Sequence, residues 1–314
     1  MIRFSLVIAI VWALLVPRPG SCVEVAQNAA PLIIGDTFTI DSRALGETRR
    51  INVYLPPGYK ESPDSRLPVL YMPDGGMAED FLHVAGLVQI SVTNQTMRPF
   101  LLVGIENTER RRDMTGPTEN DDDKKIAPRV GGSSAFRKFI RDELMPENRW
   151  RYRTTSETAI VGESLAVLFV IETFLMEPDL FDTYIAIDPS LWWNNAKLLN
   201  GAADQLRARP KLAKTLYFAS SDEPGIVVNT KRLAGILTTN APSTIRWRYE
   251  SMPGEQHSTI YHPAALRAFR DVFKPRTGGG TVDRKTEDGA PVGAKRDIRA
   301  VGLQPCGHSR LDSS

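Results

Sequence analysis

The stretch Ala159–Val170 reads AIVGESLAVLFV, a short apolar run that breaks at one serine and then resumes with helical spacing. This pattern predicts a strand, a sharp turn at Ser164 and a helix, which together form a nucleophile elbow. A serine at such a junction is lifted out of the fold, beside backbone N–H groups that can bind an oxyanion. The turn requires small neighbours: Gly162 fits, and Ala166 stands where the usual pattern has a second glycine. Taken alone, Ser164 could also be the N-cap of a buried helix.

Strand-like and helix-like periods alternate around this stretch. The expected strands cover residues 38–40, 51–55, 67–72, 100–105, 158–161, 184–187, 216–219 and 245–249. Helices are expected at 79–90 and 134–144, after Ser164, in a Trp-rich stretch near 192, and at 226–237 and 264–273. The pattern predicts an α/β fold, with a mostly parallel central sheet of about eight strands and helices on both faces.

Ligands of such sheets gather outside the carboxyl ends of the strands, so polar residues after each strand are candidates for a site. His257 follows the last strand and precedes the last helix, which makes it the best candidate for a general base. His83 and His262 fall in or beside predicted helices, and His308 lies in the tail.

A histidine base needs a carboxylate on its other ring nitrogen. Glu223 and Asp222 follow the strand at 216–219, between Ser164 and His257 in chain order, and Asp188 ends the preceding strand. Chain order alone does not separate these three acids. We rank Glu223 first, Asp222 close behind and Asp188 third.

The first 22 residues resemble a secretion signal, because Arg3 precedes an apolar run of 13 residues, Phe4 to Val16, and Pro17 to Ser21 end it. A bilayer span needs about 20 residues, so we expect export to the periplasm or the medium and no membrane span in the mature chain. Lipid attachment at Cys22 is a weaker alternative, because Pro19 stands where a lipobox has an aliphatic residue. An uncleaved membrane anchor is the other alternative.

Beyond the leader, we expect one α/β domain at 27–276 and a Gly-rich, polar tail at 277–314 that is disordered. Cys306 and His308 in that tail are too few for a metal site. A net charge of +2 gives no electrostatic reason to expect a nucleic-acid partner. Nothing in the sequence indicates a metal or an organic cofactor.

Several motifs in the same order resemble the “Putative esterase” family of α/β-hydrolases, which includes esterase D, feruloyl esterases and the enterobactin and bacillibactin esterases. The resemblance runs from Phe38 to Phe273 and is strongest to the siderophore esterases. Its motifs are VYLPPGY at 53–59, LPVLYMPDG at 67–75, VGIENT at 103–108, RRRDMT at 110–115, the elbow, PSLWW at 189–193 and GEQHS at 254–258. Two positions depart from the family: Ala166, and Asp188, where the family usually has serine.

The resemblance implies an α/β-hydrolase fold and a serine esterase that acts on a small-molecule ester, such as a siderophore, aryl or short acyl ester. Ser164 would attack the carbonyl, and His257 would transfer the proton with or without an acid, since some relatives work with a Ser-His pair alone. An acyltransferase on the same fold, or a binding protein without catalytic activity, are the alternatives.

Further site residues follow from their places beside the elbow. The N–H of Leu165 would form half of the oxyanion hole, and the turn from Gly75 to Met77, which includes Gly76, the other half. Arg110 and Arg112 could bind an anionic or catecholate substrate or brace their loop. Trp192 and Trp193 could line an acyl or aromatic pocket or pack beneath a lid.

Overall fold

One twisted sheet of eight strands organises the chain in the computed structural model, which describes residues 30–127 and 129–275. Its strand order is β1-β2-β4-β3-β5-β6-β7-β8. β2 is antiparallel to both β1 and β4, and the remaining pairs are parallel. The strands are β1 (Gly35–Ser42), β2 (Glu47–Tyr54), β3 (Leu67–Pro73), β4 (Leu101–Ile105), β5 (Thr154–Glu163), β6 (Thr183–Ile187), β7 (Thr215–Ser220) and β8 (Arg246–Ser251).

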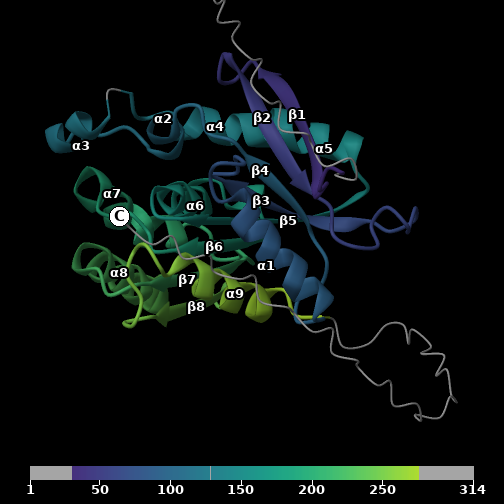
Figure 1. Cartoon of the computed structure of the whole chain (residues 1–314). Helices are drawn as coiled ribbons and strands as arrows, with labels where there is room; N and C mark the ends of the chain where they lie inside the picture. Colours follow the sequence, from purple (N-terminus) through teal and green to yellow (C-terminus); the bar gives the residue numbers. More distant parts are fainter. Residues whose placement is uncertain (1–29, 128, 276–314) are drawn as a thin grey trace, which may run out of the picture. The chain divides into compact units, whose positions relative to one another are not determined.

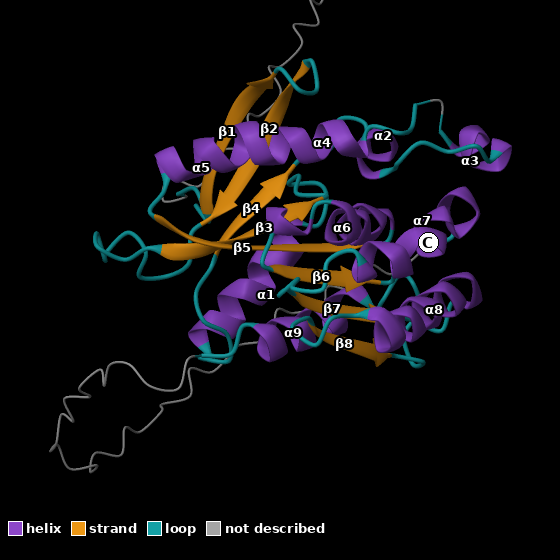
Figure 2. Cartoon of the chain, turned by 180° about the vertical axis from the view of Figure 1, so that it is seen from behind, coloured by secondary structure: helices purple, strands orange, loops and turns teal. Residues whose placement is uncertain are grey.

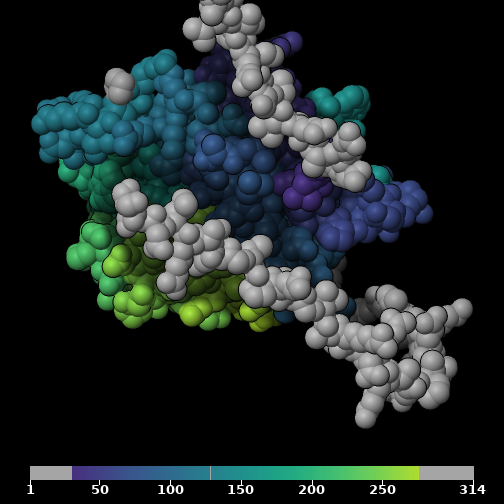
Figure 3. Space-filling view, viewed as in Figure 1, coloured from purple at the N-terminus to yellow at the C-terminus, as the bar shows by residue number. Residues whose placement is uncertain are grey.

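Helices cover both faces of this sheet, so the predicted fold class is confirmed (Figures 1 and 2). α1 (Phe81–Thr93) and α9 (Tyr261–Val272) pack together on one face of the sheet. Figure 3 gives a space-filling view in the orientation of Figure 1. The other face carries α4 (Ser133–Phe139), α6 (Leu165–Met176), α7 (Trp193–Arg207) and α8 (Pro224–Asn240). Shorter segments are α2 (Arg110–Met114), α3 (Asp121–Ile126), the π-helix η1 (Ile140–Leu144), α5 (Met145–Arg151) and the 3₁₀-helix η2 (Pro178–Leu180).

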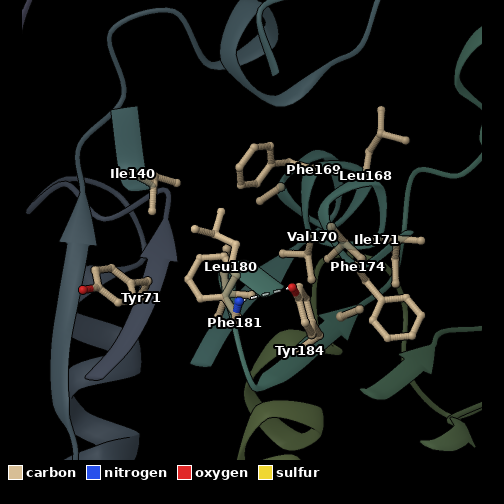
Figure 4. Close-up of a cluster of buried hydrophobic side chains, with 14 of the residues drawn as sticks. Tyr71, Ile140, Leu168, Phe169, Val170, Ile171, Phe174, Leu180, Phe181 and Tyr184 are labelled. Carbon is tan, nitrogen blue, oxygen red and sulfur yellow. Dashed lines mark hydrogen bonds between the residues drawn. The ribbon is translucent and has the colours of Figure 1, made fainter. Parts of the chain in front are cut away.

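Alternation along the inner strands divides the apolar core into two clusters. In β3, Val69 and Tyr71 belong to the cluster beneath α6, whereas Leu70 and Met72 belong to the cluster beneath α1 and α9. Figure 4 shows part of the first cluster, in which Phe169 of α6 lies above Tyr184 of β6 and Phe174 of α6 meets the Tyr184 ring edge-on, with 5.3 Å between the ring centroids. α6 is apolar around nearly its whole circumference and is therefore buried from Leu165 to Leu175. The helix that follows Ser164 is thus packed into the core along nearly its whole length.

Each of the eight predicted strands is present, with ends that shift by a few residues. The predicted helix at 134–144 is divided, because its last five residues form the π-helix η1. The sequence analysis missed α2, α3 and α5, which are five to seven residues long and too short to show a helical period.

The predicted leader at 1–22 and tail at 277–314, with Cys22, Cys306 and His308, lie outside the described residues. Within the part of the chain that is described, no helix combines the length and the apolar character needed to cross a bilayer.

Candidate active site

Ser164 lies in the sharp turn between β5 and α6, as the elbow pattern predicts. Its backbone has φ 59° and ψ −119°, a conformation that L-residues rarely adopt. Backbone hydrogen bonds hold this turn: the Ser164 N–H donates to the carbonyl of Ile187 (3.0 Å), and its carbonyl accepts from Val167 (3.1 Å) and Ser190 (3.2 Å). Contacts with β6, with the loop that follows it and with α6 therefore hold the strained serine in place.

The alanine at position 166 fits the elbow because Gly162 leaves room for it. A Cβ built on Gly162 would lie 3.0 Å from the Cβ of Ala166, closer than most real contacts of this kind. One methyl group is therefore accommodated between these positions, and two would be crowded. The departure from the family pattern at Ala166 leaves the elbow geometry intact.

His257 lies in the loop between β8 and α9, and its Nδ1 is 2.6 Å from Oδ2 of Asp188. Asp188 follows β6 directly, is fully buried and has φ 55°. The Ser164 N–H bonds to Ile187, the residue before Asp188, so Ser164, Asp188 and His257 meet at one edge of the sheet. This arrangement leaves the Nε2 of His257 as the ring nitrogen that can exchange a proton with a serine.

The ranking of the acids was wrong, since Asp188 and not Glu223 or Asp222 binds the imidazole. Asp222 and Glu223 are both exposed. The backbone N–H of Asp222 donates to Glu255, and Glu223 precedes the first turn of α8. Asp188 reaches His257 because β6 is the immediate neighbour of β5 and the left-handed turn at its end directs the carboxylate along the sheet edge.

Ser221, which the sequence analysis missed, holds Asp188 in place. Its backbone N–H donates to Oδ1 of Asp188 (2.6 Å) and its hydroxyl to Oδ2 (3.0 Å). The Asp188 hydrogen bond raises the pKa of His257, and the negative charges of Glu163, Asp188 and Glu223 act in the same direction, against the opposing effect of burial. The only available sequence signal was that Ser221 is the second residue after the predicted strand at 216–219.

Glu163, the residue before the serine, was also missed. Its Oε1 is 3.4 Å from the same Nδ1 of His257. Burial raises the pKa of Glu163 to about 7, although the positive charges of His257 and Arg110 lower it. Among the described residues, Glu163, Asp188 and His257 are the one group of three carboxylate or imidazole side chains whose polar atoms all lie within 4.8 Å of one another. Since Asp188 is already hydrogen-bonded to the ring, the cluster is arranged for proton transfer.

The predicted oxyanion donors have different outcomes. Leu165 is the first residue of α6, where backbone N–H groups have no acceptor within the helix. Gly75 was a wrong choice, because its N–H donates to the carbonyl of Ile105 (3.0 Å) and a Cβ there would lie 2.2 Å from Gly104. The N–H of Gly76 donates to the carboxylate of Glu79 (2.7 Å), an acceptor that an oxyanion could replace.

Of the two predicted arginines, only Arg110 faces this edge. Two bonds of 2.7 and 2.8 Å join it to Asp74, its side chain is 36% exposed, and its charge acts on Glu163. Arg112 instead binds Glu47 (2.7 Å) and Asp113 (2.7 Å), beside the buried pair of Arg49 and Asp113. The guanidinium of Arg112 therefore braces the loop against β2, which is the second of the two roles that the sequence left open for it.

The two tryptophans also differ. Trp193 is buried, and its Nε1 donates to the carbonyl of Gly116 (3.1 Å), whereas Trp192 is 37% exposed. Trp193 is followed by a left-handed turn at the start of α7, where Asn194, Asn195 and Ala196 have φ of 49°, 54° and 56°. Of the two rings, Trp192 keeps an exposed surface for a ligand, whereas Trp193 packs in the interior, the second of the two roles that the sequence left open.

The fold and this edge together define a class, the serine hydrolases with the α/β-hydrolase fold. A solved IroE-like serine hydrolase from Shewanella oneidensis has a TM-score of 0.69 with this chain at 27% identity, over 76% of this chain and 80% of that one. The solved BES protein from Bacillus cereus has the same fold, with a TM-score of 0.70 over 81% of this chain and all of that one.

Within that class, the chain belongs to the “Putative esterase” family, whose model matches residues 42–262, and it is a carboxylic ester hydrolase. Ferri-bacillibactin esterase BesA of Bacillus subtilis is 32% identical over 256 residues, which is 73% of this chain and 86% of that protein. Siderophore triacetylfusarinine C esterase of Aspergillus fumigatus is 29% identical over 190 residues, 55% of this chain and 61% of that protein.

Proposed function

We propose that this enzyme hydrolyses the ester bonds of siderophore-type substrates with a triad of Ser164, His257 and Asp188. The observation that carries the assignment of the triad is the 2.6 Å bond between His257 and Asp188, at the edge where the strained Ser164 ends β5. The names of the relatives, which act on ferri-bacillibactin and on triacetylfusarinine C, support the substrate class.

In the proposed acylation step, the Oγ of Ser164 attacks the ester carbonyl carbon as its proton passes to Nε2 of His257. Asp188 stabilises the imidazolium that forms, because it accepts the Nδ1 proton in a hydrogen bond. The tetrahedral oxyanion accepts hydrogen bonds from the N–H groups of Leu165 and Gly76. In this step the oxyanion replaces the Glu79 carboxylate as the acceptor for the Gly76 N–H. The intermediate then collapses, and the leaving alcohol takes the proton from Nε2.

In the deacylation step, a water molecule gives a proton to Nε2 and attacks the acyl carbon. The second tetrahedral intermediate releases the carboxylic acid, and Nε2 returns the proton to the Oγ of Ser164. Arg110 and Trp192 are the proposed substrate contacts, because each keeps about a third of its surface exposed near this edge.

A substrate panel tests the proposed class. Ferric trilactone siderophores, feruloyl esters and short p-nitrophenyl esters would be compared by kcat/KM, with the Ser164→Ala variant as the background. We expect the siderophore esters to give the highest Ser164-dependent value. A preference for feruloyl or acetyl esters by about tenfold or more would contradict the siderophore assignment and leave the triad standing.

We also propose that residues 1–22 direct export and are removed. Mass spectrometry of the mature N-terminus after cell fractionation tests this. A mature chain in the periplasm or medium that begins near Cys22 supports the proposal, and a chain in the cytoplasm that still carries residues 1–22 refutes it.

A further inference from the structure

The carboxyl group of Glu163 has an unusual position for a residue at the end of a central strand. It lies beside the nucleophile in sequence, its side chain is 17% exposed, and its Oε1 is 3.4 Å from Nδ1 of His257. That Nδ1 already bonds to Asp188 at 2.6 Å. In the described part of the chain, the contact with His257 is the one polar contact that the Glu163 carboxyl makes.

Local structure does not account for a glutamate at this position. The carboxyl accepts no backbone hydrogen bond from the described residues, so it caps no helix and braces no turn. A buried carboxylate without hydrogen bonds destabilises a fold, and a glutamine or an apolar residue would avoid that cost. What sets this carboxyl apart is its place beside the imidazole.

Charged groups from several elements act on this carboxyl. Asp188 after β6 and Asp80 before α1 disfavour its charge, whereas His257 and Arg110 of α2 favour it. The half-buried Tyr261 of α9 and, near His257, the exposed Glu223 also face this group. With burial as the largest effect, the pKa of Glu163 is about 7, so the group changes charge in the range where an esterase works.

We propose that Glu163 is a second carboxylate partner of His257, a positioning residue that shares Nδ1 with Asp188 and supports the imidazolium once it is ionised. This inference rests on the proposed triad. With both carboxylates charged, the imidazolium that forms during catalysis is stabilised from two sides. With Glu163 protonated, Asp188 acts alone. Glu163 also stands close enough to the ring to replace Asp188 in part when that residue is removed.

The first experiment compares the pH profile of kcat/KM for the wild type with that of Glu163→Gln, using a short p-nitrophenyl ester. Below pH 6 the glutamine matches the protonated acid, so the ratio of the two rates should be close to one. Above pH 8 we expect the wild type to be faster by about three- to tenfold, a modest share of one charge interaction. The ratio should change with a midpoint near the pKa of Glu163, about 7.

Asp64→Asn is the matched control, because Asp64 is an exposed acid before β3, at the opposite edge of the sheet. Its rate ratio to the wild type should not change with pH. A ratio for Glu163→Gln that is independent of pH would overturn the proposal, because loss of packing alone would lower the rate equally at every pH.

The second experiment removes Asp188. We expect Asp188→Ala to retain activity that depends on Glu163, so that Asp188→Ala with Glu163→Gln is slower than Asp188→Ala by about tenfold or more at pH 8. Equal rates for these two variants would contradict the role as a second partner.

Ser164→Ala separates this inference from the proposed function. If that variant hydrolyses the ester at the wild-type rate, the triad itself is wrong. If its activity is lost while Glu163→Gln follows the wild-type profile, only the role of Glu163 is refuted. Thermal melts of each variant confirm that it is folded, and the pH ratio remains decisive if the double variant does not fold.

Discussion

Asp188 combines complete burial, a left-handed backbone and three acceptor contacts, from Ser221 twice and from His257. A buried carboxylate persists only where hydrogen bonds and opposite charge compensate its loss of water. Ser221 and His257 provide these hydrogen bonds, and the imidazolium of His257 provides the opposite charge. The same contacts fix the imidazole in one orientation, which a proton relay requires.

Replacement of Asp188 by asparagine tests its role in the triad. The amide oxygen would stay with the Ser221 N–H and the NH2 group would face Nδ1 of His257. That NH2 group can only donate, so His257 would be held in the wrong tautomer, and we expect kcat to fall by about 10³- to 10⁴-fold. Glu223→Gln removes an exposed charge of the same sign from the same edge, and its effect should remain within about threefold. Steady-state kinetics at pH 8 measures both variants. A larger loss for Glu223→Gln than for Asp188→Asn would reverse the assignment.

Glu163 should lower the stability of the protein at neutral pH. Its pKa is raised from 4.5 to about 7, so the folded state holds a proton that the unfolded chain has lost. Stability therefore falls as the pH rises from about 4.5 to about 7 and is constant above. The shift corresponds to an upper limit of about 3 kcal/mol. Glu163→Gln should thus be more stable than the wild type at pH 8 by about 1 to 3 kcal/mol, and little different at pH 4.5.

Urea denaturation at the two pH values measures this difference, with Asp64→Asn as the control for the loss of one negative charge. A glutamine variant that is less stable than the wild type at pH 8 would show that Glu163 is a structural residue. If Glu163→Gln is more stable than the wild type at pH 8 but hydrolyses the ester more slowly, then glutamate at this position favours catalysis at the expense of stability.

The elbow between β5 and α6 depends on the space shared by Gly162 and Ala166. Because a Cβ at position 162 would approach that of Ala166 to 3.0 Å, Gly162→Ala should destabilise the protein by about 1 to 3 kcal/mol and displace Ser164. Gly162→Ala with Ala166→Gly should recover part of the loss, since one methyl group is again present. Thermal unfolding and ester turnover report the two effects. A double variant as impaired as Gly162→Ala would show that the backbone of residue 166, at 3.3 Å, is the true obstacle.

Ion pairs join the strand β2 to the segment that follows β4. Arg49 is fully buried and binds Glu47 (3.0 Å) as well as Asp113, while Arg112 binds Glu47 and Asp113 from the loop. Side chains that are far apart in sequence thus meet, and a short motif cannot reveal such partners. This explains why Arg110 and Arg112 looked equivalent in the sequence although only Arg110 faces the site.

At the scale of the whole molecule, periodicity was enough to predict the sheet. Apolar runs predicted the eight strands, the Gly-Glu-Ser turn predicted Ser164, and the loop after the last strand predicted His257. These predictions succeeded because each depends on a short, local stretch of sequence. The choice of Asp188 depended on which strand lies beside β5, and the sequence held three acids after two strands. The commitment of the Gly75 N–H to Ile105 likewise depends on the pairing of β3 with β4. Long-range pairing was the missing information in both cases.

The most direct test of the account is the turnover number of Ser164→Ala on the best ester of the panel, measured on protein whose melting temperature matches that of the wild type. We predict a loss of kcat by about 10⁴- to 10⁶-fold, as expected when the nucleophile of a serine hydrolase is removed. Turnover within tenfold of the wild type would contradict the central claim that Ser164 carries the acyl group.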